Sequence, residues 1–283
     1  MPRPRHARSQ VHPLLVLLLA ASICALRPAH AADDRAAVST INHAFATELG
    51  TGAYDFGGSS IFVLSFTPEW EVRDVTTSVP GMRLIFPMTL GSVGFSPEDT
   101  IGGQLPNRID SFSLMPGVEF DYPLRNDWML SPWLRAGASF ADGSNEGWLY
   151  GVGARMEQLS TKGRLEVQRQ HELALVVVDY RTASGSDRFL RLRNAIDIRR
   201  NTLRLGGTRH LVAGFYTIVD IVPDPPEAPA DVGKQSVIQM EGGITFNTDP
   251  RFEIGPIRWP RIGLGYRYAG DFSGWRIVVG APF

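Results

Sequence analysis

The segment Gly147-Trp-Leu-Tyr-Gly-Val-Gly-Ala-Arg-Met-Glu157 decides the fold, because its large apolar residues recur with a period of two. Leucine, glycine, arginine and glutamate occupy the positions between them. Successive side chains of a β-strand point to opposite faces of a sheet. The segment therefore predicts a strand with one face suited to lipid and the other suited to a crowded, polar interior.

Similar runs continue from about residue 60 to the end of the chain, separated by clusters of Gly, Asn, Asp, Ser and Pro. The eleven predicted strands are 60–71, 80–93, 110–122, 128–140, 147–158, 163–180, 188–205, 209–221, 235–247, 255–269 and 274–283. Bacterial single-chain outer-membrane barrels have an even number of strands. We therefore expect a twelfth strand at 43–54. The alternative is that residues 36–49 form a short helix inside the barrel. The segment 36–54 is thus predicted to be either the first strand or an internal helix. The sequence thus predicts an all-β fold, a transmembrane antiparallel β-barrel of 12 strands, over residues 32–283.

The first 31 residues have the order of a secretory signal peptide, with basic, then apolar, then small residues. We expect export to the outer membrane and removal of this segment. The single cysteine, Cys24, lies within it, so we expect no thiol chemistry, metal site or cofactor in the mature chain. Acidic residues (29) nearly balance basic ones (28), which makes nucleic acid an improbable ligand.

The tryptophans and the connections favour a membrane barrel over a soluble β-sandwich, which is the alternative for an alternating pattern. Five tryptophans lie at or near predicted strand ends, where headgroups would meet them: Trp70, Trp128, Trp148, Trp259 and Trp275. The links at 123–127, 159–162 and 206–208 are short, and those at 94–109 and 222–234 are long. We expect the short links in the periplasm and the long ones outside the cell.

Charged residues on the inferred inner faces predict the lining of the lumen. The predicted lumen residues are Arg83, Glu119, Asp121, Arg135, Arg155, Glu157, Arg191, Arg193, Asp197, Glu241, Arg267 and Arg276. One interpretation is a porin-like lumen whose arginines attract anions. The other, which we favour, is that arginines and carboxylates pair and fill a narrow barrel, because an unpaired buried arginine is costly.

The C-terminal stretch from Ile262 to Phe283 resembles the solitary outer-membrane autotransporter-like β-barrel family. Its final run places Trp275, Ile277, Val279 and Phe283 on one apolar face and ends in phenylalanine, the form of an outer-membrane assembly signal. The resemblance implies a twelve-stranded barrel in a Gram-negative outer membrane, without a passenger domain. It also implies outer-membrane lipid and the barrel-assembly machinery as partners. We expect a monomer with a structural or narrow-channel role and no catalysis.

Two other functions remain open at this point. An enzyme that modifies lipid or lipopolysaccharide would need His171 or His210 near a serine and a carboxylate. His171-Glu172 also begins like a zinc-protease helix, but Leu175 stands where that motif needs histidine. A surface-binding barrel would instead use the links at 94–109 and 222–234.

Overall fold

The structure is a computed structural model of the 283-residue chain. It describes residues 47–283 except 57–58, 77, 94–110, 142–145, 182–185, 207–208, 225–236, 250–252, 255–256, 259–260 and 271. These residues belong to a compact unit that spans 36–283. Helix in this described part is confined to residues 47–49, and none of its helices is long and apolar enough to cross a membrane. The predicted signal peptide, His43 and Trp259 lie outside the described residues.

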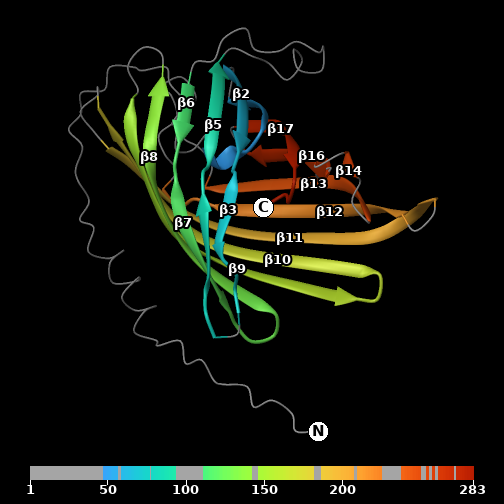
Figure 1. Ribbon diagram of the computed structural model, residues 1–283. Coiled ribbons are helices and arrows are strands. Elements are labelled where there is room, and N and C mark those ends of the chain that lie inside the picture. Colours follow the sequence, from blue (N-terminus) through green and yellow to red (C-terminus); the bar gives the residue numbers. More distant parts are fainter. Residues whose placement is uncertain are drawn as a thin grey trace. The chain divides into compact units, whose positions relative to one another are not determined.

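One antiparallel sheet of fifteen strand pieces forms the wall of the barrel (Figure 1). Nine pieces cross the wall alone: β1 (Gly52–Phe56), β8 (Trp128–Ala141), β9 (Gly147–Lys162), β10 (Leu165–Tyr180), β11 (Ser186–Gly206), β12 (Arg209–Ile221), β13 (Ile238–Asp249), β16 (Ile262–Ala269) and β17 (Phe272–Val279). Three crossings consist of two pieces each: β2 (Ser59–Phe66) with β3 (Glu69–Arg73), β4 (Gly81–Ile85) with β5 (Met88–Val93), and β6 (Ser111–Leu114) with β7 (Gly117–Pro123). β1 pairs with β17 and β8 pairs with β9, so the sheet closes on itself. The twelve-stranded antiparallel barrel confirms the predicted fold class.

Proline causes the three interruptions. Pro68, Pro87 and Pro116 occupy neighbouring places on adjacent strands, and proline has no N–H to donate to the ladder. The strands stay joined through the proline carbonyls, which accept from Phe86 N (2.9 Å), Met115 N (2.9 Å) and Ala136 N (3.0 Å) respectively. Each predicted run of 60–71, 80–93 and 110–122 is therefore one crossing with a local break at its proline. We call these three residues the proline row.

Two predicted strands have boundaries that differ from the expectation. The run 255–269 was too long, because β16 begins at Ile262 and two short pieces, β14 (Glu253–Ile254) and β15 (Ile257–Arg258), form a separate sheet. The run 274–283 was also too long, since β17 ends at Val279 and Gly280 has a φ of +93°.

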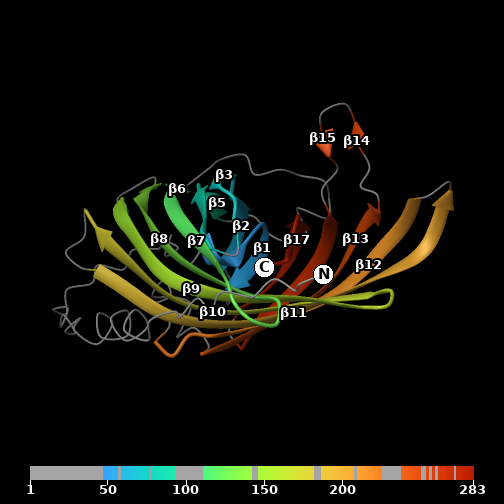
Figure 2. The same cartoon turned by 60° about the horizontal axis from the view of Figure 1, so that its bottom comes forward.

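The placing of Phe283 on the outer apolar face was therefore wrong. After the turn at Gly280, Phe283 packs against an inner cluster made of Ala195, Tyr216, Ile218 and Val278. Figures 1 and 2 both show this end of the chain within the ring of strands. Trp275, Ile277 and Val279 do face outward, and they are 45%, 43% and 64% exposed.

The chain enters the wall from the inside of the barrel. Residues 47–49 are helical, and β1 begins only at Gly52, so the predicted strand at 43–54 is shorter than expected. Leu49 is fully buried, and the Tyr54 hydroxyl donates to its carbonyl at 2.7 Å. Gly50 has a φ of +80°, which glycine adopts without strain. The described part of 36–54 thus contains a helical turn inside the ring followed by a short strand.

The outer face of the barrel is apolar on nearly every strand. Large apolar side chains are exposed, among them Phe66, Leu134, Trp148, Tyr150, Leu173, Leu192, Phe215, Ile244, Leu264, Tyr266, Trp275 and Ile277. A water-soluble protein rarely exposes a contiguous apolar surface of this extent. A closed ring also satisfies its backbone hydrogen bonds internally, as the hydrocarbon core requires. The barrel is therefore a membrane-spanning one.

The two ends of the barrel differ in their connections. We call the end that bears the links 94–110, 142–146, 181–185 and 222–237 the loop end. We call the opposite end, with the turns 124–127, 163–164 and 207–208, the hairpin end. Its turns are tight: Asn126 and Asp127 both have positive φ, 60° and 61°, as two-residue hairpin loops prefer. Of the two predicted external loops, all of 94–109 and residues 225–234 of 222–234 lie outside the described residues.

Candidate functional site: the charged interior of the barrel

Arginines and carboxylates from most of the wall strands meet inside the barrel. All the predicted lumen residues lie at inward positions, because they alternate with the exposed residues of the outer face. Most of them belong to one of four ion-paired groups, which are described in turn below. Charges buried in this way are stabilised only when they are paired and hydrogen-bonded.

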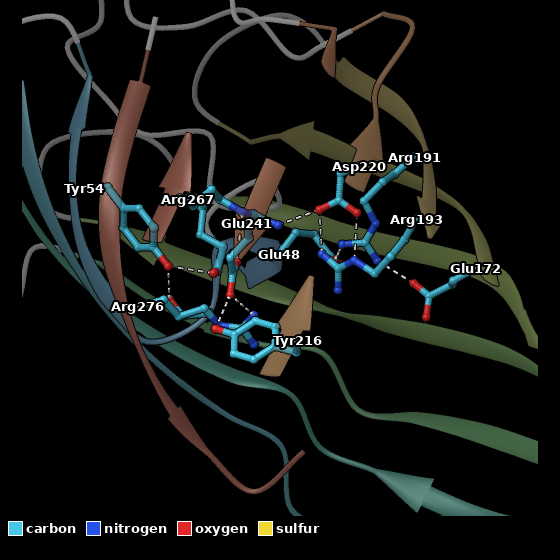
Figure 3. A network of polar contacts seen from close by, with 12 residues as sticks. Glu48, Tyr54, Glu172, Arg191, Arg193, Tyr216, Asp220, Glu241, Arg267 and Arg276 are labelled. Carbon is cyan, nitrogen blue, oxygen red and sulfur yellow. Dashed lines mark hydrogen bonds and ion pairs between the residues drawn. The ribbon is translucent and has the colours of Figure 1, made fainter. Parts of the chain in front are cut away.

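The largest group joins β11, β12, β13, β16 and β17 (Figure 3). Arg193 donates to both oxygens of Asp220, from Nε at 2.7 Å and from Nη2 at 2.9 Å. Arg267 Nη2 donates to Asp220 Oδ2 at 2.5 Å, and its Nε lies 3.3 Å from Glu241 Oε2. Arg276 Nη1 donates to Glu241 Oε1 at 2.9 Å. Three arginines thus share two carboxylates, and we call these five residues the Asp220 network.

A tyrosine and two glycines position this network. The Tyr216 hydroxyl donates to Glu241 Oε1 at 2.8 Å, and Tyr216 is fully buried. Its ring needs the space beside Gly243 and Gly265. An added Cβ would lie 2.5 Å from Tyr216 Cε1 at Gly243, and 2.0 Å from the hydroxyl oxygen at Gly265. The absence of side chains at these glycines therefore fixes the place of Tyr216, which in turn orients Glu241.

A second group ties the internal helical turn to the wall. Arg191 on β11 donates from Nη1 to Glu48 Oε2 and from Nη2 to Glu172 Oε1. The side chains of Arg191 and Glu172 are 5% and 7% exposed, and that of Glu48 is 13% exposed. Figure 3 shows Glu48 directed toward the arginines of β11. One arginine therefore bridges a wall carboxylate and a carboxylate that precedes the first strand.

A third group lies on β3, β4, β7 and β9. Glu119 is 1% exposed and accepts from Arg83 Nη2 and, at 2.6 Å, from Arg155 Nη2. Arg83 Nε also lies 3.0 Å from Asp121 Oδ2. Arg155 Nε lies 3.9 Å from Glu157 Oε1, so Glu157 is at the margin of the group. Arg83 Nη1 also donates to Glu69 Oε2 on β3 at 2.9 Å, so the group contains two arginines and four carboxylates.

A fourth group surrounds Asp197, whose side chain is fully buried. Arg261 donates to both of its oxygens at 2.6 Å, and Arg199 Nε lies 3.2 Å away. The Arg261 Nε also donates to Thr245 Oγ1 at 2.7 Å. The sequence analysis named Asp197 but neither arginine.

Arg135 differs from the other predicted lumen residues. Its guanidinium carbon lies 4.2 Å from the centroid of the Trp133 ring, a cation–π arrangement, and Trp133 is 3% exposed. Among the described residues, none forms an ion pair with Arg135. Trp133 is also the tryptophan that the sequence analysis did not place at the headgroup level, and it lies inside the barrel.

An apolar layer lies beside these charges toward the loop end. Its buried members come from around the ring and from the internal segment: Leu49, Tyr54, Ile61, Val63, Met115, Leu149, Val176, Val178, Phe189, Val222, Ala269 and Phe272. Side chains from opposite walls thus belong to one cluster, which we call the apolar layer. The ion-paired groups and the apolar layer therefore occupy neighbouring parts of the interior.

Several interior residues escaped the sequence analysis. Glu172 and Asp220 lie at inward positions of predicted strands whose faces had not been assigned. Arg261 lies two residues before Gly263, on the face already assigned to Arg267, so alternation could have found it. Glu48 lies within the predicted strand at 43–54, but in the structure it belongs to the helical turn before β1, so strand alternation does not place it.

The two described histidines, His171 and His210, lie on β10 and β12. His171 and Glu172 are successive residues of a strand, so they point to opposite faces and cannot act together. His171 faces outward and its Nδ1 lies 2.8 Å from Asn194 Oδ1. His210 lies opposite Asp249 at the hairpin end. In the described part of the chain, no group of three or more His, Cys, Asp or Glu residues is arranged to hold a metal ion.

No protein-family model matches the sequence, and no curated protein matches it either. Among solved structures, the crystal structure of the beta domain of the Bordetella autotransporter BrkA is similar, with 12% identity and a TM-score of 0.46. The match covers 80% of this chain and 95% of that one, and we transfer no residue role from it. By its own strand order and pairing, the chain is a closed twelve-stranded membrane barrel, the architecture that its resemblance to autotransporter-like barrels implied.

Proposed function

We propose that the protein is an outer-membrane barrel of the translocator type that serves as a structural element with a closed lumen and needs no passenger domain for this role. In this proposal the hairpin end faces the periplasm, because short turns lie on that side of such barrels. The barrel-assembly machinery inserts it, and it is a monomer surrounded by outer-membrane lipid. The outward Trp275, Ile277 and Val279 support insertion, since they continue the apolar belt to the end of β17.

The observation that carries the proposal is the Arg191–Glu48 ion pair. It joins the wall to a segment that lies inside the ring, beside the buried Leu49 of the apolar layer. Opening a pore there would separate buried charges, which costs several kcal/mol per ion without new partners. The paired interior thus favours a closed barrel over an anion channel.

Single-channel conductance of the refolded protein in planar bilayers tests this proposal. We expect no steady current from the wild type, and intermittent current from Glu48→Gln, which removes one charge of the bridge. Glu146→Gln is the matched control, because the Glu146–Arg181 pair is exposed, with an oxygen–nitrogen distance of 3.7 Å. A steady anion-selective current from the wild type would overturn the closed lumen and favour the narrow channel instead.

A further inference from the structure

The outer wall carries one polar cluster among its apolar side chains, toward the hairpin end. It consists of Gln158 on β9, Arg169 and His171 on β10, Asn194 on β11, and Trp128 at the start of β8, and we call it the outer cluster. In the sheet, Arg169 lies opposite Gln158 and His171 lies opposite Asn194. Arg169 and His171 face outward, because the residues between and after them, Gln170 and Glu172, are 1% and 6% exposed and face inward.

The polar side chains of the outer cluster contact one another through neutral amides. Arg169 Nη1 donates to Gln158 Oε1 at 2.9 Å. His171 Nδ1 lies 2.8 Å from Asn194 Oδ1; an amide oxygen only accepts, so the ring donates from Nδ1 and keeps Nε2 available. The Trp128 ring stacks on His171 with centroids 5.8 Å apart and an angle of 26°. The cluster thus holds the Arg169 guanidinium in place without neutralising it.

The surrounding outer wall is also cationic. Lys162 and Arg200 are exposed near the same ends of β9 and β11. The acids of these strand segments are engaged elsewhere: Glu157 lies beside Arg155, and Glu166 pairs with Arg199 at 2.6 Å. The adjoining turn carries Arg125 and Asp127, one charge of each sign. The interior pairs its arginines with carboxylates, whereas this outer surface leaves positive charge for an external ligand.

The height of the outer cluster places it at a membrane interface. Trp148 and Tyr150 mark the loop-end border of the belt, and Trp148 lies opposite Asp179 on β10. Between Asp179 and His171 the outward residues are Val177, Leu175 and Leu173. These eight steps span about 26 Å along the strand, close to the apolar band of roughly 25 Å in such barrels. Cations at this depth meet lipid headgroups.

We propose that Arg169 and His171, with Trp128 beside them, form a binding site for the phosphodiester headgroup of an anionic glycerophospholipid. Arg169 contributes the charge, His171 Nε2 adds a second polar contact, and the ring of Trp128 lies at headgroup depth. Leu173, 40% exposed next to His171, offers an acyl chain an apolar surface. A soluble phosphate would gain the charge but not this apolar contact. The inference rests on the proposed placement in a membrane.

Native mass spectrometry of the refolded barrel in mixed micelles tests the site, with phosphatidylglycerol and phosphatidylcholine as competing probes. We expect the wild type to retain phosphatidylglycerol preferentially. Arg169→Gln should lower that preference about fivefold, which corresponds to roughly 1 kcal/mol for one cation near an anionic surface. Arg188→Gln is the matched control, since it removes the same charge from the outer face of β11 at the loop end, opposite Val177. His171→Gln should give a smaller loss than Arg169→Gln.

Several outcomes would overturn the inference. Equal losses in the Arg169 and Arg188 variants would mean a general surface charge and no site. Displacement of phosphatidylglycerol by millimolar inorganic phosphate would mean an ion site and no lipid site. Flotation with vesicles and heat-modifiable migration are measured in parallel. A barrel that floats but shows no lipid preference contradicts this inference alone, whereas one that does not float contradicts the proposed function.

Discussion

The guanidinium of Arg193 contacts both carboxylate oxygens of Asp220, the residue directly opposite it in the β11–β12 register. Arg267 reaches the same carboxylate from β16. Asp220 therefore joins three strands that are not all neighbours, and its side chain is 2% exposed. A cross-strand pair of this kind adds directional contacts to a ring already closed by backbone hydrogen bonds.

Replacing Asp220 by asparagine should destabilise the barrel strongly, because two buried arginines lose their charged partner. Breaking a buried ion pair from one side costs about 3–5 kcal/mol. Urea-induced unfolding of the refolded barrel in lipid vesicles measures the change. Glu146→Gln, which removes an exposed pair, should change stability by less than about 1 kcal/mol. Similar stabilities for the two variants would show that the Asp220 network contributes little.

Gly265→Ala should also destabilise the barrel, since its Cβ would lie 2.0 Å from the Tyr216 hydroxyl oxygen. Tyr216→Phe removes that oxygen and the hydrogen bond to Glu241, at a cost of about 1–3 kcal/mol. In the double variant the two costs should not add, because phenylalanine removes the contact at 2.0 Å and leaves the nearest atoms 3.1 Å from the new methyl group. The same urea unfolding measures the cycle. Additive costs would mean that the ring and Gly265 do not interact as described.

The tryptophans should divide into lipid-facing and interior groups. Trp275 is 45% exposed on the outer face, whereas Trp133 is 3% exposed beneath Arg135. In variants that keep a single tryptophan, brominated lipid should quench Trp275 fluorescence strongly and leave Trp133 nearly unchanged. Acrylamide quenching of Trp133 should be weak too, because its side chain is buried. Strong quenching of Trp133 by brominated lipid would contradict its inward orientation.

Two glycines with positive φ should respond differently to alanine. Gly163, with a φ of +62°, has no atom within 4 Å of an added Cβ. Gly163→Ala should therefore cost about 1–2 kcal/mol, the left-handed penalty alone. At Gly50, with a φ of +80°, the Cβ would lie 2.6 Å from Arg276 Nε, so Gly50→Ala should cost more and disturb the Arg276–Glu241 pair. Equal costs in urea unfolding would show that the chain does not turn inward there as described.

Alternation in the sequence was sufficient to place the residues of those strands whose faces were assigned, with the exception of Phe283. The period of two placed Arg155 inward and Trp148 outward, and both lie so. This succeeds because neighbouring side chains of a strand must point to opposite sides. The same rule, extended by one step along β16, would have added Arg261.

The rest depends on contacts that are remote in sequence. One of the two partners of Arg191 is Glu48, which is 143 residues away in the sequence. No local pattern in the sequence pairs these two residues. Phe283 turns inward because of the positive φ of Gly280, which the sequence does not reveal. The proline row was visible, but its effect on the strands depends on three prolines becoming neighbours in the sheet.

The inward turn at Gly50 links the position of the upstream chain to the closing of the ring. β1 is one of the two strands that complete the circle, and the residues just before it, Glu48 and Leu49, already lie among interior side chains. A finished cylinder offers these residues no path through its hydrogen-bonded wall. Once β1 and β17 have paired, the remaining route to the inside is through an open end of the barrel. Closing the circumference first therefore obliges this segment to thread lengthwise, whereas occupying the centre first does not.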